Sequence, residues 1–151
     1  KKFKNSCLQS HKKDEENVDS KLQPYDQREI YNLKNFFTGS VYKVTIDNTH
    51  PMAFGYNDIY YSLKQGNQSY KFLDSGYNVG YIKGDAVSVS GFSGKEAKKG
   101  LKNSIVFAEK RMGRGSVIYL VDDVLFRSFW ENGKLFLVNA IFFVNNNKFI
   151  L

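Results

Sequence analysis

Alternation of apolar and polar side chains marks the first strand that the sequence predicts. In SVYKVTID, residues 40–47, the side chains of Tyr42, Val44 and Ile46 alternate with those of an opposite, more polar face. This period of two is typical of a strand with one buried face. Short runs rich in β-branched and aromatic residues follow, punctuated by glycines, and they predict further strands. These lie within IYYSLK at 59–64, YKFLD at 70–74, NVGYIK at 78–83 and AVSVSGF at 86–92.

The chain after these strands predicts a short helix and then a strand pair. Ser93 and Glu96 have the three-residue spacing of a capping box, which predicts a surface helix over residues 94–102. The segments SIVFAEKRM and SVIYLV predict two strands joined through MGRG, where Gly113 and Gly115 supply the backbone freedom of a tight hairpin. The second strand is continuously apolar, and we therefore expect it to be central in the sheet and covered on both faces.

The last third of the sequence predicts two helical pieces. Asp122 and Asp123 end the apolar strand and are placed to cap a helix. Gly133 divides the following segment, VLFRSFWENGKLFLVNAIFFV, into pieces at 124–130 and 133–143. The second piece is apolar almost all round, which is typical of a helix packed deep against a sheet. Strands, a helix, a strand pair and final helices together favour an α/β or α+β fold with a mixed sheet.

The N-terminal part has a different character. Residues 8–29 are polar, dense in charge and poor in β-branched side chains, so we expect a surface excursion or a partly disordered loop there. Ordered structure is expected to begin near residue 40. The predicted organisation is a polar N-terminal excursion at 1–39, an α/β domain at 40–144 and a tail at 145–151.

Composition narrows the class of protein to a single globular domain. The chain has 151 residues, of which 42% are hydrophobic and 16% aromatic, enough to build a buried core. Its net charge of +7 suits an anionic partner. Only four of its 22 basic residues are arginine, however, the residue favoured for bidentate contacts with bases and phosphates. We therefore expect no nucleic-acid partner and keep a lysine-rich anion or nucleic-acid binder as an alternative.

Candidate metal chemistry is sparse in this sequence. The single cysteine is Cys7 and the two histidines are His11 and His50, without the Cys/His spacing of a zinc site. No metal or other cofactor is therefore predicted in this chain. The longest apolar run, at 135–144, is interrupted by Asn139 and is too short to span a bilayer, so no transmembrane segment is predicted.

Three segments of the sequence resemble a known family. They are DNTHPMAFGY at 47–56, NVGYI at 78–82 and GRGSVIYLVDDVLFRSFWENGKLFLVNAIFFV at 113–144. The most specific positions are Gly113–Arg114–Gly115, Phe126–Arg127, Trp130 and Asn139. They resemble the C-terminal domain that follows the catalytic domain in some Bacteroidetes zinc carboxypeptidases of the carboxypeptidase A type. That domain is similar to class I glutamine amidotransferase domains, so the resemblance implies a flavodoxin-like three-layer fold, present either whole or as its C-terminal part.

The same resemblance implies a secreted or periplasmic parent peptidase whose zinc chemistry lies outside this chain. Such an enzyme needs a His-x-x-Glu pair, whereas His11 is followed three residues later by Asp14 and His50 by Ala53. Zinc is therefore expected only in the parent catalytic domain, which would be the partner of this chain in cis. A peptide or a glycan is the ligand that an accessory domain of this kind would recognise.

The amidotransferase likeness raises a second hypothesis, a degenerate or active hydrolase that uses Cys7 and His50. In those enzymes a His-Pro pair carries the general base, and here His50 precedes Pro51. The nucleophile needs a strand–turn–helix elbow with small neighbours, which KNSCLQS around Cys7 lacks, and Met52 occupies the place of the acid. The structural interpretation is a turn in which residues 47–49 end a strand and Pro51 starts the next segment.

Arg127, Trp130 and Asp123 form the candidate ligand-binding set. They follow the apolar strand, and ligands of open α/β sheets bind at the carboxyl ends of strands. An anion or carbohydrate contact would use Arg127 and Trp130. The alternative is that Arg127 pairs with Asp122 or Asp123 and that Trp130 belongs to the core. Our first hypothesis for function is a non-catalytic accessory domain that docks onto the catalytic domain or recognises substrate or the cell envelope.

Overall fold

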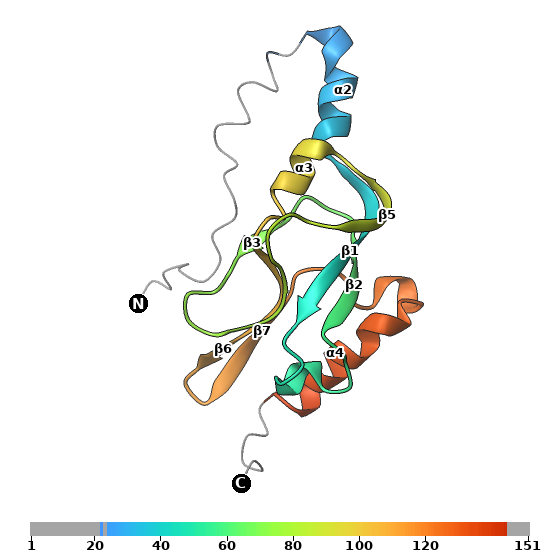
Figure 1. The fold of residues 1–151 in the computed structure, drawn as a ribbon. Helices are drawn as coiled ribbons and strands as arrows, with labels where there is room; N and C mark the ends of the chain where they lie inside the picture. Colours follow the sequence, from blue (N-terminus) through green and yellow to red (C-terminus); the bar gives the residue numbers. More distant parts are fainter. Residues whose placement is uncertain (1–21, 23, 145–151) are drawn as a thin grey trace.

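A computed structural model describes residue 22 and residues 24–144 of the chain (Figure 1). The candidate nucleophile Cys7, the histidine His11 and the predicted tail lie outside these residues. Within the described part, seven strands are combined with three α-helices and two short 3-10 helices. The predicted combination of helices and strands, the α/β class in its broad sense, is therefore confirmed.

One curled sheet holds all seven strands. They are β1 Phe37–Ile46, β2 Ile59–Lys64, β3 Tyr70–Lys71, β4 Tyr77–Ile82, β5 Ser88–Ser93, β6 Ser104–Met112 and β7 Gly115–Leu120. The strand order is β2-β1-β4-β6-β3, with β5 also paired to β1 and β7 also paired to β6. The long strands β1 and β6 thus organise the sheet. Strands β5 and β4 pair with the same edge of β1, and β2 pairs with its other edge. Strands β3 and β7 pair with the same edge of β6, and β4 pairs with its other edge.

Every pairing among the described strands is antiparallel, so the predicted mixed sheet is wrong for this part of the chain. Parallel neighbours need crossover connections of a dozen or more residues, usually with a helix. Here the two-residue connection at 113–114 joins the paired strands β6 and β7, and a loop of this length allows only antiparallel neighbours. The described strands therefore do not confirm the flavodoxin-like arrangement that the resemblance implies.

The β6–β7 hairpin forms where the sequence predicts it, but β7 lies at the edge of the sheet. Its two-residue loop begins with Gly113 at φ 63°, a conformation that glycine adopts without strain. We expected β7 to be central, whereas among the described strands it pairs only with β6. Its continuous apolar run has another cause. Ile118 and Leu120 pack against the main core, and Tyr119 and Val121 pack against a second, smaller cluster.

The helices lie at two ends of the molecule (Figure 1). They are α2 Tyr25–Asn35, α3 Lys95–Lys99 and α4 Glu131–Phe142, with the 3-10 helices η1 Pro51–Ala53 and η2 Phe126–Ser128. The helix α2 contacts α3 and β5, whereas α4 contacts η1 and β2. The expectation that order begins near residue 40 is therefore wrong, because residues 25–35 are helical. This helix buries none of its residues, so its sequence carries no core-facing stripe that would have revealed it.

The helix starts also differ from the prediction. Helix α3 has Gly94 as its N-cap and no side-chain cap, because Ser93 ends β5 and bonds the Tyr42 hydroxyl at 2.7 Å. The predicted helix at 124–130 is reduced to η2, in which Arg127 has φ 49° and cannot continue a right-handed helix. Gly133 does not divide the last helix but lies inside α4. A Cβ atom there would be 2.2 Å from the Val124 carbonyl oxygen, so only glycine fits.

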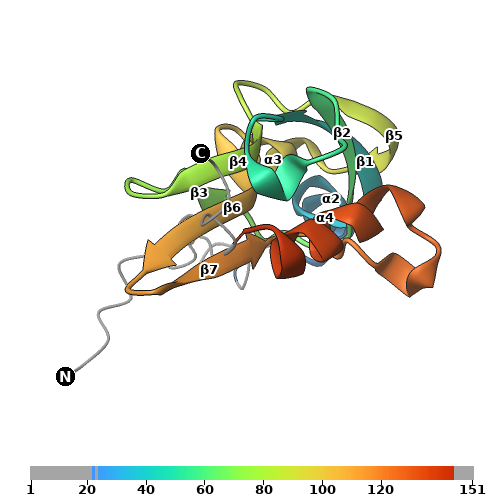
Figure 2. The same cartoon turned by 90° about the horizontal axis from the view of Figure 1, so that it is seen from below.

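Aromatic side chains form the centre of the core. Phe136 of α4 stacks on Phe107 of β6 with ring centroids 4.0 Å apart, and on Tyr56 with centroids 4.1 Å apart. Tyr60 of β2 meets both Phe107 and Phe136 edge-on. Helix α4 therefore packs across the inside of the curled sheet, next to η1 (Figure 2). This arrangement fixes the turn between β1 and η1.

Candidate functional site

The turn after β1 carries the candidate site. β1 ends at Ile46, and Asp47 Oδ1 accepts hydrogen bonds from the Thr49 amide at 3.1 Å and from the Thr49 hydroxyl at 2.5 Å. Pro51 disfavours a helical conformation at the preceding His50, which is extended at φ −81° and ψ 138° and caps η1. The predicted strand-ending turn is therefore confirmed.

Both ring nitrogens of His50 are engaged. Nδ1 accepts a hydrogen bond from the Met52 amide at 3.2 Å, and Nε2 lies 2.9 Å from Glu109 Oε2. Because Nδ1 is an acceptor, the neutral imidazole carries its proton on Nε2 and donates it to the Glu109 carboxylate. Glu109 is only 2% exposed, and its other oxygen accepts a hydrogen bond from the Ser116 hydroxyl at 2.5 Å. The His50–Glu109 pair therefore connects the turn between β1 and η1 to strand β6.

Burial keeps this imidazole neutral. Desolvation lowers the pKa of His50 from its ordinary value of 6.5, and this effect outweighs the neighbouring Glu109 and Asp47 carboxylates, which raise the pKa. The Arg111 guanidinium lowers the pKa further. At neutral pH the site therefore contains two carboxylates, one guanidinium and an uncharged imidazole.

A pocket of about 260 Å³ opens beside the His50–Glu109 pair. Asp47 and Arg111 contribute charges of opposite sign to its wall. The Tyr77 ring lies against the His50 imidazole, with ring centroids 5.1 Å apart and planes tilted by 49°. The remaining lining residues are Thr49, Pro51 and Val144.

The order of the groups determines what chemistry the arrangement can perform. The Glu109 carboxylate lies between the Ser116 hydroxyl and the His50 imidazole. The hydroxyl therefore donates its hydrogen bond to the carboxylate and not to the imidazole, which would be the base that activates it as a nucleophile. To accept a proton from a substrate, His50 would have to release the Met52 amide. The other candidate, Cys7, lies outside the described residues. Within the part of the chain that the structure describes, no group of three or more His, Cys, Asp or Glu is placed to hold a metal ion.

The structure places the three predicted ligand-binding residues with different partners. Arg127 is exposed, with its guanidinium 5.1 Å from the centre of the preceding aromatic ring. Trp130 Nε1 donates to the Tyr60 hydroxyl at 3.2 Å, and Asp123 Oδ1 accepts from the Leu125 amide at 2.9 Å. In the described part of the chain, none of these contacts joins one member of the set to another.

A buried ion pair at the end of β2 was missed from the sequence. Lys64 Nζ lies 2.8 Å from Asp122 Oδ1, and the Ser62 hydroxyl donates to Asp122 Oδ2 at 2.6 Å. The alternative in which Arg127 pairs with Asp122 or Asp123 is therefore wrong for the described structure. Strand alternation contained a usable signal, because Lys64 follows Ser62 on the inward face of β2 and a buried lysine needs a partner.

Helix α4 has one buried side and one open side. Its buried residues are Gly133, Phe136 and Asn139. Exposed side chains at helical spacing form the opposite side, and they are Leu135, Val138, Ile141 and Phe142, named here the α4 face. The helix was expected to pack deep against a sheet, and α4 does pack against the sheet but on one side only.

The apolar surface continues from the α4 face onto the segment after η1. Asn139 Nδ2 donates to the carbonyls of Met52 at 3.1 Å and Phe54 at 2.7 Å, which holds this segment against the helix. The Phe54 ring is exposed and meets the Phe143 ring edge-on, with centroids 5.5 Å apart. Phe54 and Phe143 therefore extend the α4 face.

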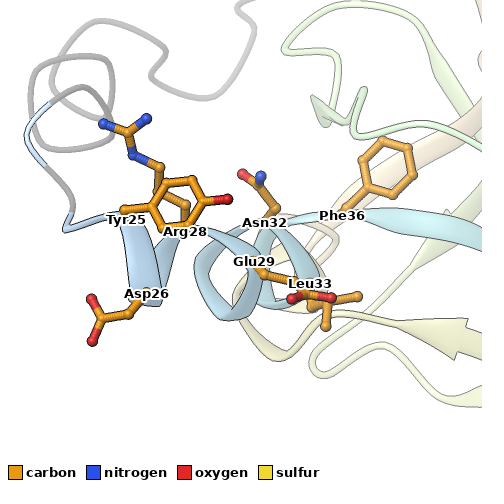
Figure 3. Close-up of a pocket in the computed structure, with 7 residues that line it drawn as sticks. All are labelled: Tyr25, Asp26, Arg28, Glu29, Asn32, Leu33 and Phe36. Carbon is orange, nitrogen blue, oxygen red and sulfur yellow. The ribbon is translucent and has the colours of Figure 1, made fainter.

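A larger hollow of about 480 Å³ lies along α2 (Figure 3). Its wall comes from one helix and the residue that follows it, and every lining side chain is exposed. Tyr25, Arg28 and Leu33 are among these residues. Among the described residues, its wall contains no buried polar side chain, whereas the wall of the pocket beside His50 contains the buried His50 and Glu109. The pocket beside His50 is therefore the better candidate for a binding site.

No protein-family model, curated protein or solved structure matches the chain. Among the described residues, no helix has the length and apolar character needed to cross a membrane.

Proposed function

We propose that this chain is a non-catalytic accessory domain whose α4 face docks onto a neighbouring domain of the same polypeptide. The observation that carries the proposal is the open apolar side of a helix whose other side belongs to the core. Contiguous exposed apolar surface of this kind marks interaction sites in soluble proteins. The turn and its His50–Glu109 pair would then serve to hold the docking surface in shape.

The size of the patch favours a tethered partner. Phe54, Phe142 and Phe143 are 66%, 60% and 43% exposed. At about 200 Å² per phenylalanine, they present about 340 Å² of apolar surface, to which the aliphatic residues of the α4 face add. A stable interface between free proteins buries about 800 Å² per partner, whereas contacts between domains of one chain begin at about 300 Å² per side. A covalent linker raises the effective concentration, so a small interface stays occupied.

A second copy of the chain is a poorer occupant of this surface. Each chain carries a net charge of +7, so two copies repel each other at low salt. They also lack the linker that would compensate for a small contact. We therefore expect the 151-residue chain to sediment as a monomer. A dimer that is lost on Val138→Asp substitution would contradict the proposed partner.

The family resemblance supports the same kind of partner, because the domain it names follows a catalytic domain. The neighbour would then be a zinc-carboxypeptidase-like domain of a secreted or periplasmic protein, with the zinc bound there. Docking, and through it the positioning of a peptide or glycan substrate, would be the contribution of this chain.

Two matched valine substitutions in the natural polypeptide test the proposal. Val138→Asp places a charge in the α4 face, and Val89→Asp places the same charge on β5, where the side chain is 56% exposed against 44% for Val138. Docking predicts that only Val138→Asp releases the domain, detected as faster proteolysis of the linker and a more extended X-ray scattering profile. Equal effects of the two substitutions, no effect of either, or a natural polypeptide without another folded domain would contradict it.

A further inference from the structure

The wall of the pocket beside His50 contains opposite charges, on Asp47 and Arg111, that form no ion pair with each other in the described structure. We propose that it binds a small zwitterion, a free α-amino acid with an apolar side chain. The ligand carboxylate would lie on Arg111 and the ligand ammonium group on Asp47. This site uses other residues than the α4 face and is independent of the proposed docking role.

Arg111 is placed to hold a carboxylate. It lies two residues after Glu109 on β6, so strand alternation puts both side chains on one face of the sheet. Arg111 Nε is 4.0 Å from Glu109 Oε1, and the two Glu109 oxygens already accept shorter hydrogen bonds from Ser116 and His50. Glu109 therefore orients the Arg111 guanidinium. The other N–H groups of this guanidinium can donate two parallel hydrogen bonds to a second carboxylate, that of the ligand.

Asp47 provides the complementary charge. Its Oδ1 accepts the two hydrogen bonds from Thr49, whereas Oδ2 has no partner among the described residues. Asp47 is exposed and forms no ion pair within the described part of the chain. A ligand ammonium group would supply the charge-assisted hydrogen bonds that this carboxylate lacks.

The sheet sets the separation between the two charges. Asp47 follows β1 and Arg111 lies on β6, and β4 runs between these strands. Two strand spacings amount to about 10 Å, and the register adds an offset along the strands, because Asp47 follows the Ile46–Gly80 pair and Arg111 follows the Glu109–Tyr77 pair. The Arg111 side chain lies beside Glu109 and lines the same pocket as Asp47, so a ligand that fills this pocket reaches both charges. Tyr77 of β4 also lines the pocket, with its ring against the His50 imidazole.

Charge and size distinguish a zwitterion from other small ligands. A simple anion would face the carboxylates of Asp47 and Glu109, and a simple cation would leave the Arg111 fork without a partner. A zwitterion satisfies both sides at once. The volume of about 260 Å³ is below the range of about 300–1,000 Å³ for drug-sized ligands, so one amino acid fits. Pro51 and Val144 provide apolar contact for its side chain.

Three related compounds test the charge requirement in titrations of the ¹⁵N-labelled chain followed by NMR. L-leucine carries both charges, N-acetyl-L-leucine lacks the ammonium group and L-leucinamide lacks the carboxylate. We expect saturable shifts of the His50, Tyr77 and Arg111 signals with L-leucine. Each of the other two compounds should bind about tenfold more weakly, because one charge-assisted contact is lost.

Single substitutions assign each charge to its residue. Arg111→Gln should weaken L-leucine to the affinity of L-leucinamide and leave L-leucinamide unchanged. Asp47→Asn keeps an Oδ1 that accepts the Thr49 hydrogen bonds, so the turn is retained, and it should weaken L-leucine to the affinity of N-acetyl-L-leucine. Arg114→Gln, an exposed arginine of the neighbouring hairpin, is the matched control and should change nothing.

Four outcomes would overturn the proposal. L-leucine could give no saturable shifts at about 10 mM, or L-leucinamide or N-acetyl-L-leucine could bind as well as L-leucine. An effect of Arg114→Gln equal to that of Arg111→Gln would assign binding to the general positive charge of the domain. The docking role is tested on Val138, so the two proposals can fail separately.

Discussion

The two sides of helix α4 are similar in composition and different in what they contact. On the buried side, Phe136 stacks on Phe107, and Asn139 holds the carbonyls of Met52 and Phe54. On the other side, the α4 face presents apolar residues of the same kind to the surface. Apolar character alone therefore does not distinguish a helix side that builds the fold from one that is available for binding. The specific contacts make that distinction.

The largest effect is expected from truncating the buried side. Phe136→Ala should lower the free energy of unfolding by about 3–5 kcal/mol, because it removes a fully buried ring and leaves a cavity. Ile141→Ala on the α4 face, where the side chain is 63% exposed, should cost less than about 1 kcal/mol. Urea denaturation of both variants measures the difference, and equal losses would remove the distinction between the two sides.

The next effect comes from the amide that holds the segment after η1. Asn139→Ala leaves two carbonyl groups without their donor and should cost about 2 kcal/mol in the free energy of unfolding. Asn132→Ala is the matched control on the same helix, because within the described residues its side-chain amide makes only a long, exposed contact of 3.4 Å. If both asparagine variants lose the same stability, the hydrogen bonds from Asn139 to the two carbonyls contribute nothing specific.

A smaller effect is expected from pH. His50 in the unfolded chain titrates near 6.5, whereas burial lowers its pKa in the fold. Between these two pKa values the unfolded state binds more protons, so the free energy of unfolding falls as pH drops below about 6.5 and levels off below the folded-state pKa. Because His50→Gln removes this contribution, the stability difference between the wild-type chain and the variant should shrink from about pH 8 to about pH 5. A difference that stays constant or grows would show that His50 does not titrate in this way.

The smallest effect on stability is expected at the α4 face. Val138→Asp in the isolated chain should change the free energy of unfolding by less than about 0.7 kcal/mol, the scale of a helix-propensity change at an exposed position. Thermal unfolding followed by circular dichroism measures it. A loss comparable to that of Phe136→Ala would mean that the face is covered within this chain.

The local pattern of residue types was sufficient to predict most of the strands. The short β-branched and aromatic run IYYSLK predicted β2 with its observed bounds, and Gly113 predicted the β6–β7 hairpin. Residues 47–49 gave the strand-ending turn, because Asp and Thr side chains bond to nearby backbone groups. These features depend on residues close together in sequence, so they could be predicted.

Long-range pairing was not predictable in the same way. His50 meets Glu109, and Lys64 meets Asp122, only because the sheet brings distant strands together. Neither the strand order nor the antiparallel pairing follows from alternation within one strand. A charged residue in an apolar strand, such as Glu109, indicates that a buried partner exists without indicating which one. Helix α2 was missed because it buries no side chain.

Hydrogen exchange of the α4 amides tests the central claim most directly. It would be followed by mass spectrometry in the isolated 151-residue chain and in the natural polypeptide under the same conditions. If the α4 face is covered by a neighbouring domain, residues 135–142 should exchange more slowly in the natural polypeptide, while residues 25–35 of α2 exchange at the same rate in both. Equal exchange of residues 135–142 in the two proteins would contradict the account.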